Sequence, residues 1–173
     1  MNPFLRKLLA MNPLSPRTSS YLPLVATFLL GIAVALPGAG CASRSAAGRF
    51  IPATTESLAA LHEVDLRLTR LVTGGHEVDV TTYPISLRFG DGGKISGRSS
   101  VNRYFEGFEL GDEGALTWPG AGLGMTRMAG PAAAMQIESQ FSQTLTATSQ
   151  LLTTPDGARF QSADGTHVVE FQR

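Results

Sequence analysis

The sequence predicts a mainly β fold of the α+β class, an antiparallel sheet or partly closed barrel with one amphipathic helix packed on it. Three observations support this prediction. Apolar and polar residues alternate with a period of two from Val64 onward, turn signals separate the alternating segments, and one later segment has helical spacing instead. The length of 173 residues is typical of a single domain.

The alternating segments predict half-buried antiparallel strands. Residues 64–69 and 85–89 each place apolar side chains on one face and polar side chains on the other. Turn signals that tolerate the positive φ of tight hairpins follow such segments. They begin at Gly74, Asp91, Asp156 and Asp164. Further short strands are expected at 105–110, 115–118, 158–161 and 167–171.

Residues 131–150 break the period of two and predict the helix. Pro131 is favourable in a first turn, and apolar residues then recur at helical spacing. The expected inner face consists of Ala134, Ile137, Phe141, Leu145 and Thr148. We expect this helix to lie across the sheet and to bury that face in the core.

Residues 1–40 predict a secretory signal peptide. Basic residues near the start are followed by an uncharged, mostly apolar run over 21–36 and then by small residues. A transmembrane helix needs about 20 apolar residues, and prolines near both ends confine this run to fewer. Translation from Met1 or from Met11 gives the same mature protein.

Cys41, the only cysteine in the chain, is the predicted lipid attachment point. The small residues Gly38 to Gly40 precede it, and this order resembles the lipobox of bacterial lipoproteins. Gly38 stands where a lipobox prefers leucine, so cleavage near Ala39, giving a soluble periplasmic or secreted protein, is the alternative. The resemblance implies a membrane partner through the anchor on Cys41. Because Ala42 is not aspartate, it implies an outer-membrane position facing the periplasm of a two-membrane envelope.

The stretch 41–62 is predicted to be the anchor cysteine and a flexible tether. It is rich in small and polar residues without periodicity, and about 20 such residues span on the order of 25 Å. From Cys41 onward the chain has 11 basic and 14 acidic residues, with no basic cluster along the sequence. This charge balance excludes nucleic acid as an expected partner.

Several separated segments resemble the META domain shared by HslJ-like proteins. They are residues 85–110, "GMTRMAGP" at 124–131, Glu138 with Phe141 and Leu145, and "SADGTHVVEF" at 162–171. The resemblance covers about residues 84–171, and we assign 63–173 to the domain. It implies a small, strongly twisted, mainly antiparallel domain with one helix, in exported or envelope-linked bacterial proteins. No defined reaction accompanies it.

The chain departs from this family at two positions. Many members have cysteines in a Gly-Cys-Asn and a Met-Ala-Cys segment, where this chain has Val101 and Gly130. If the family's cysteines pair, the Cα atoms of Val101 and Gly130 should lie within about 7 Å of each other.

No motif in the sequence predicts an enzyme, a metal site or a cofactor. "GRSSV" at 97–101 lacks the last glycine of a nucleophile elbow. The histidines His62, His76 and His167 are scattered, and the glycines at 120–124 have the wrong spacing to hold a phosphate. We therefore expect a non-enzymatic protein without metal or cofactor.

Two sets of polar residues are candidates for a site. Asn102, Thr126, Arg127 and Glu138 belong to the segments that resemble the family and are expected to be structural. We expect Asn102 to bond a backbone turn, and Arg127 to pair with Glu138 where helix meets sheet. The second set, Arg103, Tyr104 and Trp118, would form an interaction surface if these side chains are exposed on one face, since such residues are favoured binding hot spots.

The expected role is that of an exported, lipid-anchored envelope protein with a META domain. It would act in envelope maintenance or stress tolerance by binding another envelope component. The alternative is a small-ligand carrier, which needs an apolar cavity on the order of 300 Å³ or more with a few polar groups.

Overall fold

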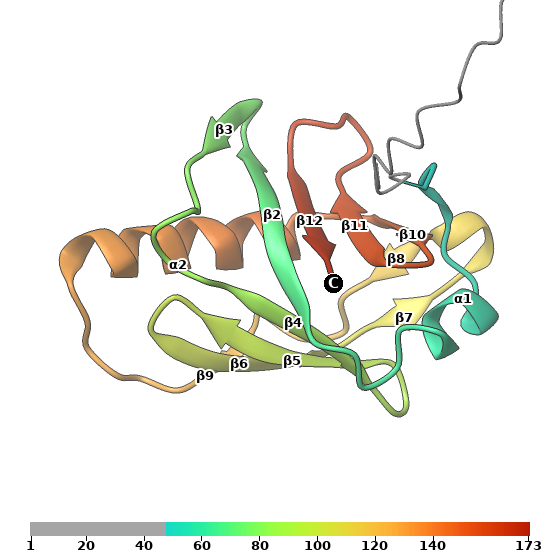
Figure 1. Ribbon diagram of the computed structural model, residues 1–173, viewed down its shortest axis with the longest axis horizontal. Helices are drawn as coiled ribbons and strands as arrows, with labels where there is room; N and C mark the ends of the chain where they lie inside the picture. The colour runs from blue at the N-terminus through green and yellow to red at the C-terminus, as the bar shows by residue number, and fades with distance from the viewer. Residues whose placement is uncertain (1–47) are drawn as a thin grey trace, which may run out of the picture. The chain divides into compact units, whose positions relative to one another are not determined.

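The computed structural model describes residues 48–173, which form an extended antiparallel sheet with one long helix (Figure 1). The predicted leader and Cys41 lie outside the described residues. The strands are β1 (Ile51–Pro52), β2 (Leu66–Thr73), β3 (His76–Val78), β4 (Ser86–Gly90), β5 (Lys94–Ser99), β6 (Asn102–Gly107), β7 (Glu109–Leu110), β8 (Leu116–Thr117), β9 (Gly124–Met125), β10 (Gln150–Thr154), β11 (Gly157–Gln161) and β12 (Val168–Gln172). The helices are α1 (Thr55–Ala59), the 3-10 turn η1 (Asp112–Gly114) and α2 (Ala132–Thr146). None of the helices in 48–173 is long and apolar enough to cross a bilayer.

Ten strands form one sheet in which neighbouring strands run antiparallel. The main order is β1-β10-β11-β12-β2-β4-β5-β6-β9, and β3 pairs with β2. The short strands β7 and β8 pair separately. The sheet is not closed into a barrel. The predicted antiparallel sheet with one main helix is therefore confirmed. Of the two predicted alternatives, a sheet or a partly closed barrel, the structure has the open sheet.

Helix α2 crosses one face of the sheet and packs on β2 and β12 (Figure 1). Phe141 and Leu145 are fully buried, and the Phe141 ring lies 5.2 Å from the ring of Tyr104. Ala134 is also buried, whereas Ile137 is only partly buried. The predicted inner face is confirmed in its main residues. Its last member, Thr148, is buried just beyond the end of the helix.

The predicted turns connect neighbouring strands, and two of them illustrate different needs for glycine. Gly92 and Gly93, between β4 and β5, both have φ of 67°, a conformation that side chains with a Cβ rarely adopt. Gly157 has no positive φ. A Cβ on Gly157 would instead lie 2.5 Å from the backbone oxygen of Phe171 on the adjacent strand. Glycine at 157 is needed because β11 and β12 approach closely there. The expectation that this turn needs glycine for a positive φ is therefore wrong.

The structure corrects the predicted tether, because residues 48–62 belong to the folded domain. β1 pairs with β10, and Thr54 and Ser57 form a reciprocal capping box at the start of α1. Leu61, just after α1, is fully buried in the core. The stretch is mostly small and polar, so its composition alone did not indicate the few residues that fix it to the domain. The part of the predicted tether that lies within 48–62 is therefore folded, and the remainder lies outside the described residues.

Candidate functional site

The carboxylate of Glu138 lies at the centre of a buried hydrogen-bond network between α2 and the β5–β6 hairpin. Glu138 is 6% exposed and Asn102 is 2% exposed. Glu138 Oε1 accepts a bond of 2.6 Å from Asn102 Nδ2. Its Oε2 accepts bonds from Ser99 Oγ and the Asn102 backbone N–H, both at 2.8 Å, and from the Val101 N–H at 3.3 Å.

The hydrogen bonds to Glu138 compensate for burying its charge. Burial alone would raise the pKa of Glu138, but the bonds from Asn102, Ser99 and Val101 together outweigh that effect and lower the pKa below its ordinary value. The buried carboxylate therefore needs no cation as a partner.

The predicted pair of Arg127 with Glu138 is wrong. Arg127 is exposed and makes no ion pair with any residue in 48–173.

Asn102 also holds the segment that follows β9. Its Oδ1 accepts bonds from Thr126 Oγ1 at 2.8 Å and from the Met128 N–H at 2.7 Å, and its Nδ2 donates to the Met128 oxygen at 3.2 Å. The expectation that Asn102 bonds backbone groups is thus correct. The amide satisfies groups on α2 and on the segment after β9, which is a structural arrangement rather than a reactive one.

The structure separates the three members of the proposed interaction surface. Tyr104 is 1% exposed, and its hydroxyl donates a 2.8 Å bond to the Ser86 oxygen. Burial raises the pKa of the Tyr104 phenol. Arg103 is exposed, because consecutive residues of β6 point to opposite faces. Arg103 and Tyr104 therefore do not share a face, and the condition for the interaction surface is not met.

Trp118 belongs to the edge of the core rather than to an exposed surface. Its indole is half-buried, stacks on Phe160 with a centroid separation of 6.1 Å, and packs edge-on against Phe108. Its Nε1 donates a 3.0 Å bond to the Thr148 oxygen. The polar group of the side chain is thereby satisfied within the domain.

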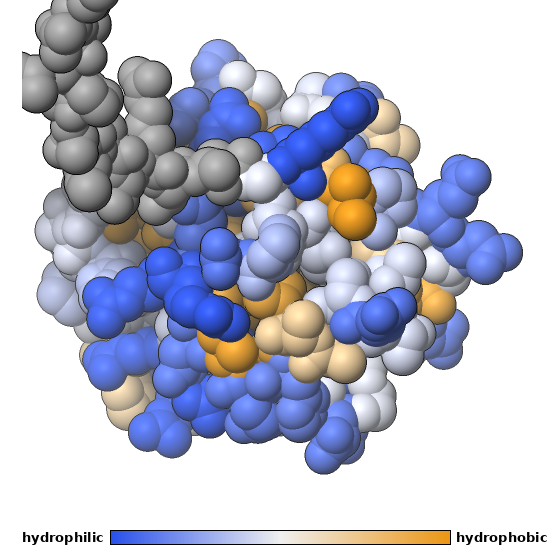
Figure 2. Space-filling view, turned by 45° about the vertical axis from the view of Figure 1, so that its right-hand side comes forward, coloured by the Kyte–Doolittle hydropathy of each residue, from blue (hydrophilic) through white to orange (hydrophobic). Residues whose placement is uncertain are grey.

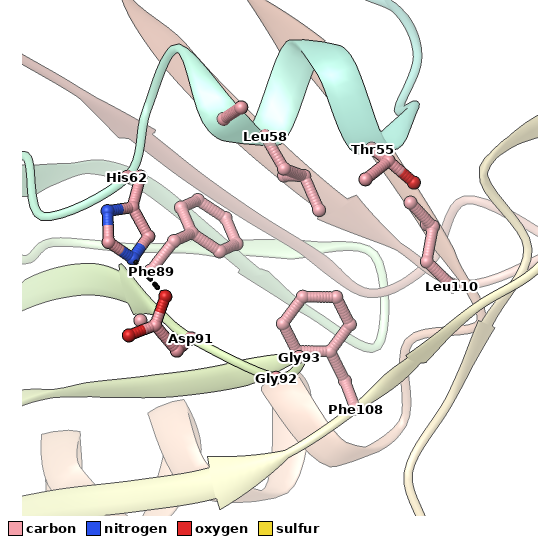
Figure 3. A pocket seen from close by; sticks show the side chains of 11 residues that line it. Thr55, Leu58, His62, Phe89, Asp91, Gly92, Gly93, Phe108 and Leu110 are labelled. Atoms are coloured by element: carbon pink, nitrogen blue, oxygen red, sulfur yellow. Dashed lines mark ion pairs between the residues drawn. The ribbon is translucent and has the colours of Figure 1, made fainter.

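A cleft of about 340 Å³, open to solvent, lies between α1 and the turn that joins β4 to β5. Leu58, Phe89 and Phe108 point toward one another across it, and His62 and Asp91 meet at one side, with Nε2 3.1 Å from Oδ1 (Figure 3). Phe89 and Phe108 are themselves almost fully buried. The cleft can therefore receive a small apolar group between a hydrophobic floor and a polar rim.

The surface also has a second cleft and small hydrophobic patches. A second cleft of about 420 Å³ lies between β1, α1 and β10, with the charged side chains of Arg49 and Glu56 in its lining. On the face shown in Figure 2, hydrophobic residues form small patches surrounded by hydrophilic ones. Within residues 48–173, no group of three or more histidine, cysteine or acidic side chains is arranged to hold a metal ion.

The META domain family model matches residues 59–173. The chain belongs to the META domain family. Its fold is similar to the NMR structure of a protein from Burkholderia xenovorans, with 23% identity, a TM-score of 0.55, and coverage of 70% of this chain and 89% of that one. A second NMR structure has 24% identity, a TM-score of 0.47, and coverage of 66% and 92%. No curated protein matches the chain.

Two positions where this META domain lacks the family's cysteines lie side by side. A Cβ built on Gly130 would lie 3.4 Å from the Cβ of Val101, close to the 3.5–4.5 Å range of disulfides. Since each Cα is one bond of about 1.5 Å from its Cβ, the two Cα atoms are no more than about 6.5 Å apart. The predicted proximity is confirmed.

The sequence interpretation of this META domain missed two contributors. Ser99 was not considered as a partner of Glu138, although it precedes Asn102 by three residues in the same hairpin. The α1 wall of the cleft, including Leu58, was assigned to the tether. A signal for α1 was available in the spacing of Thr54 and Ser57, which matches a helix cap.

Proposed function

We propose that the protein is exported, carries a lipid on Cys41, and is held at the outer membrane facing the periplasm. Its META domain would bind another envelope component, without catalysing a reaction, in envelope maintenance or stress tolerance. The observation that carries this proposal is the position of the only cysteine. Cys41 lies after an apolar segment and before the folded residues, which the structure describes from Gly48 onward. Membership of the META domain family is consistent with an envelope-associated protein.

The corrected domain boundary adds a consequence for an anchored protein. Six residues separate Cys41 from Gly48, and the seven Cα–Cα steps between these two residues reach at most about 25 Å when fully extended. The radius of gyration expected for a domain of this size is about 14 Å. A lipid on Cys41 would therefore keep the META domain within one domain diameter of the headgroups.

The test of the anchor uses the full chain expressed in a bacterium with two membranes and fed an alkyne-labelled fatty acid. We expect label on the parent, a mature chain that starts at Cys41, and recovery in the outer-membrane fraction. Cys41→Ser should abolish the label. Ala42→Asp, which leaves the thiol intact, should keep the label and move the protein to the inner membrane. A mature chain that retains the leader or has a free Cys41 thiol contradicts the proposal.

A second candidate function is carriage of a small apolar ligand. It is favoured by the cleft between α1 and the turn that joins β4 to β5. Its volume of about 340 Å³ lies at the lower end of the range for ligand pockets. The dye anilinonaphthalene sulfonate is a suitable probe, and Ala59→Phe in the cleft lining should reduce its binding. Ala133→Phe, on an exposed position of α2, is the matched control. Undiminished binding to the Ala59→Phe variant excludes this cleft as the carrier site.

A further inference from the structure

The outer face of β5 and β6 gathers three cations around an exposed aromatic ring. In the β5–β6 register Arg98 is directly opposite Arg103, and Ser96 is opposite Phe105. Lys94 lies on the same face, because side chains two and four residues apart in a strand point the same way. All five side chains are exposed, and the other face of these strands contributes Ile95 and Tyr104 to the core.

The charges on this face are not compensated within the described chain. Like charges directly opposite each other in a sheet are destabilising. Lys94, Arg98 and Arg103 make no ion pair with any residue of 48–173. On the neighbouring strand β4, by contrast, Arg88 is paired with Glu63 at 3.2 Å and with Asp65 at 2.7 Å. The β5–β6 face therefore retains a positive charge for an external anion.

Phe105 is 66% exposed at the centre of this face. Its ring lies against Gly124 of β9, where an added Cβ would come within 2.6 Å of two ring carbons. Glycine at 124 leaves room for the ring on the surface, so the aromatic group is supported on one side and open to solvent on the other. An exposed apolar ring among cations suits the boundary between headgroups and acyl chains.

The remainder of the domain has the opposite charge. Residues 48–173 contain 10 basic and 14 acidic residues, so the faces outside β5–β6 carry the acidic excess. An anionic surface attracts the β5–β6 face and repels the others.

We propose that the outer face of β5 and β6 lies on an anionic lipid surface, with Phe105 directed into the headgroup layer. This inference rests on the proposed anchor, which supplies the proximity. Three cations raise surface binding only on the order of a hundredfold. A tether of six residues turns that weak preference into a defined orientation of the domain.

The test measures whether Phe105 reaches lipid. Phe105→Trp introduces an indole at the centre of the face, and the parent, whose single tryptophan is Trp118, supplies the background. The anchored chain is reconstituted in vesicles of phosphatidylethanolamine and phosphatidylglycerol with brominated acyl chains. We expect strong quenching of the Phe105→Trp indole. We expect quenching to fall to the background in phosphatidylcholine vesicles and at high salt, because the attraction is electrostatic.

Charge reversal provides the matched comparison. Arg98→Glu with Arg103→Glu should abolish the quenching, whereas Arg49→Glu with Arg173→Glu, an equal charge change at exposed residues outside this face, should preserve it. An indole at Gln136→Trp, on an exposed position of α2, should not be quenched. Unchanged circular dichroism and thermal unfolding establish that each variant is folded.

Other outcomes overturn the proposal. Equal quenching in zwitterionic vesicles, or in the Arg98→Glu/Arg103→Glu chain, contradicts an anionic lipid site. A shift in Phe105→Trp emission with polyglutamate but not with anionic vesicles assigns the face to an acidic polypeptide. The anchor is tested separately by intact mass. Where Cys41 is not acylated, a maleimide lipid coupled to this only cysteine supplies the tether, so the lipid-surface proposal can succeed or fail independently.

Discussion

Asn102 Nδ2 donates a hydrogen bond of 2.6 Å to Glu138 Oε1, and this contact joins β6 to the middle of α2. The oxygen of the same amide accepts bonds from Thr126 and Met128 after β9. One buried side chain therefore holds a hairpin, a helix and an edge segment. These contacts use both the oxygen and the nitrogen of the Asn102 amide. The buried polar cluster around Glu138 therefore has a structural role.

Asn102→Ala should destabilise the domain strongly. The substitution leaves Glu138 Oε1 and the Met128 N–H without their buried partners, and we expect a loss of about 3 kcal/mol in the free energy of unfolding. Urea denaturation followed by circular dichroism measures it. Gln136→Ala, on the exposed side of α2, is the control and should change the free energy by less than about 0.5 kcal/mol. Equal effects of the two substitutions contradict the assigned role of Asn102.

Stability should fall in acid, in part through Glu138. Hydrogen bonds from Asn102, Ser99 and Val101 outweigh burial and hold the folded-state pKa of Glu138 below its ordinary value of 4.5. The unfolded chain therefore binds the proton more readily. The stabilising contribution is complete above pH of about 4.5 and is lost as pH falls through the lower folded-state pKa.

Glu138→Gln isolates this contribution. The variant should be less stable than the parent near neutral pH, and the difference should shrink as the pH decreases. Asp164, whose pKa is about 2 because Ser162 and Thr166 donate hydrogen bonds to it, contributes acid dependence of the same sign in both proteins. Urea midpoints measured at several pH values test this. A parent–variant difference that is constant with pH is inconsistent with a lowered Glu138 pKa.

Leu61→Ala tests the corrected start of the domain. Leu61 is fully buried although it follows the short helix α1, and its truncation should cost about 2–5 kcal/mol. Leu58→Ala, a partly buried residue at the cleft, should cost less. Thermal unfolding compares the two. If Leu61→Ala melts like the parent, residues 48–62 do not contribute to the folded unit.

The sequence predicted the location of strands that have one buried face. It did not predict side-chain partners that are chosen by packing between distant segments. Residues 85–89 alternate because Leu87 and Phe89 face the core, so β4 could be located. The same alternation could have separated Arg103 from Tyr104, but we began the strand at 105 rather than 102. The partner of Glu138 was not predictable in this way, because Asn102 and Arg127 are both polar and only the folded chain selects between them.

Val101→Cys with Gly130→Cys should restore a disulfide at the positions where this META domain has none. Gly130→Cys alone should destabilise the domain by about 1–3 kcal/mol, because its Cβ lies 2.5 Å from Val101 Cγ2. Replacing Val101 as well removes both methyl groups and leaves the Cβ atoms 3.4 Å apart. In the Cys41→Ser background we therefore expect the oxidised double variant to gain about 2–4 kcal/mol over its reduced form. Intact mass and urea denaturation with and without dithiothreitol measure the bridge and its effect, and two thiols that stay free under oxidant contradict the geometry.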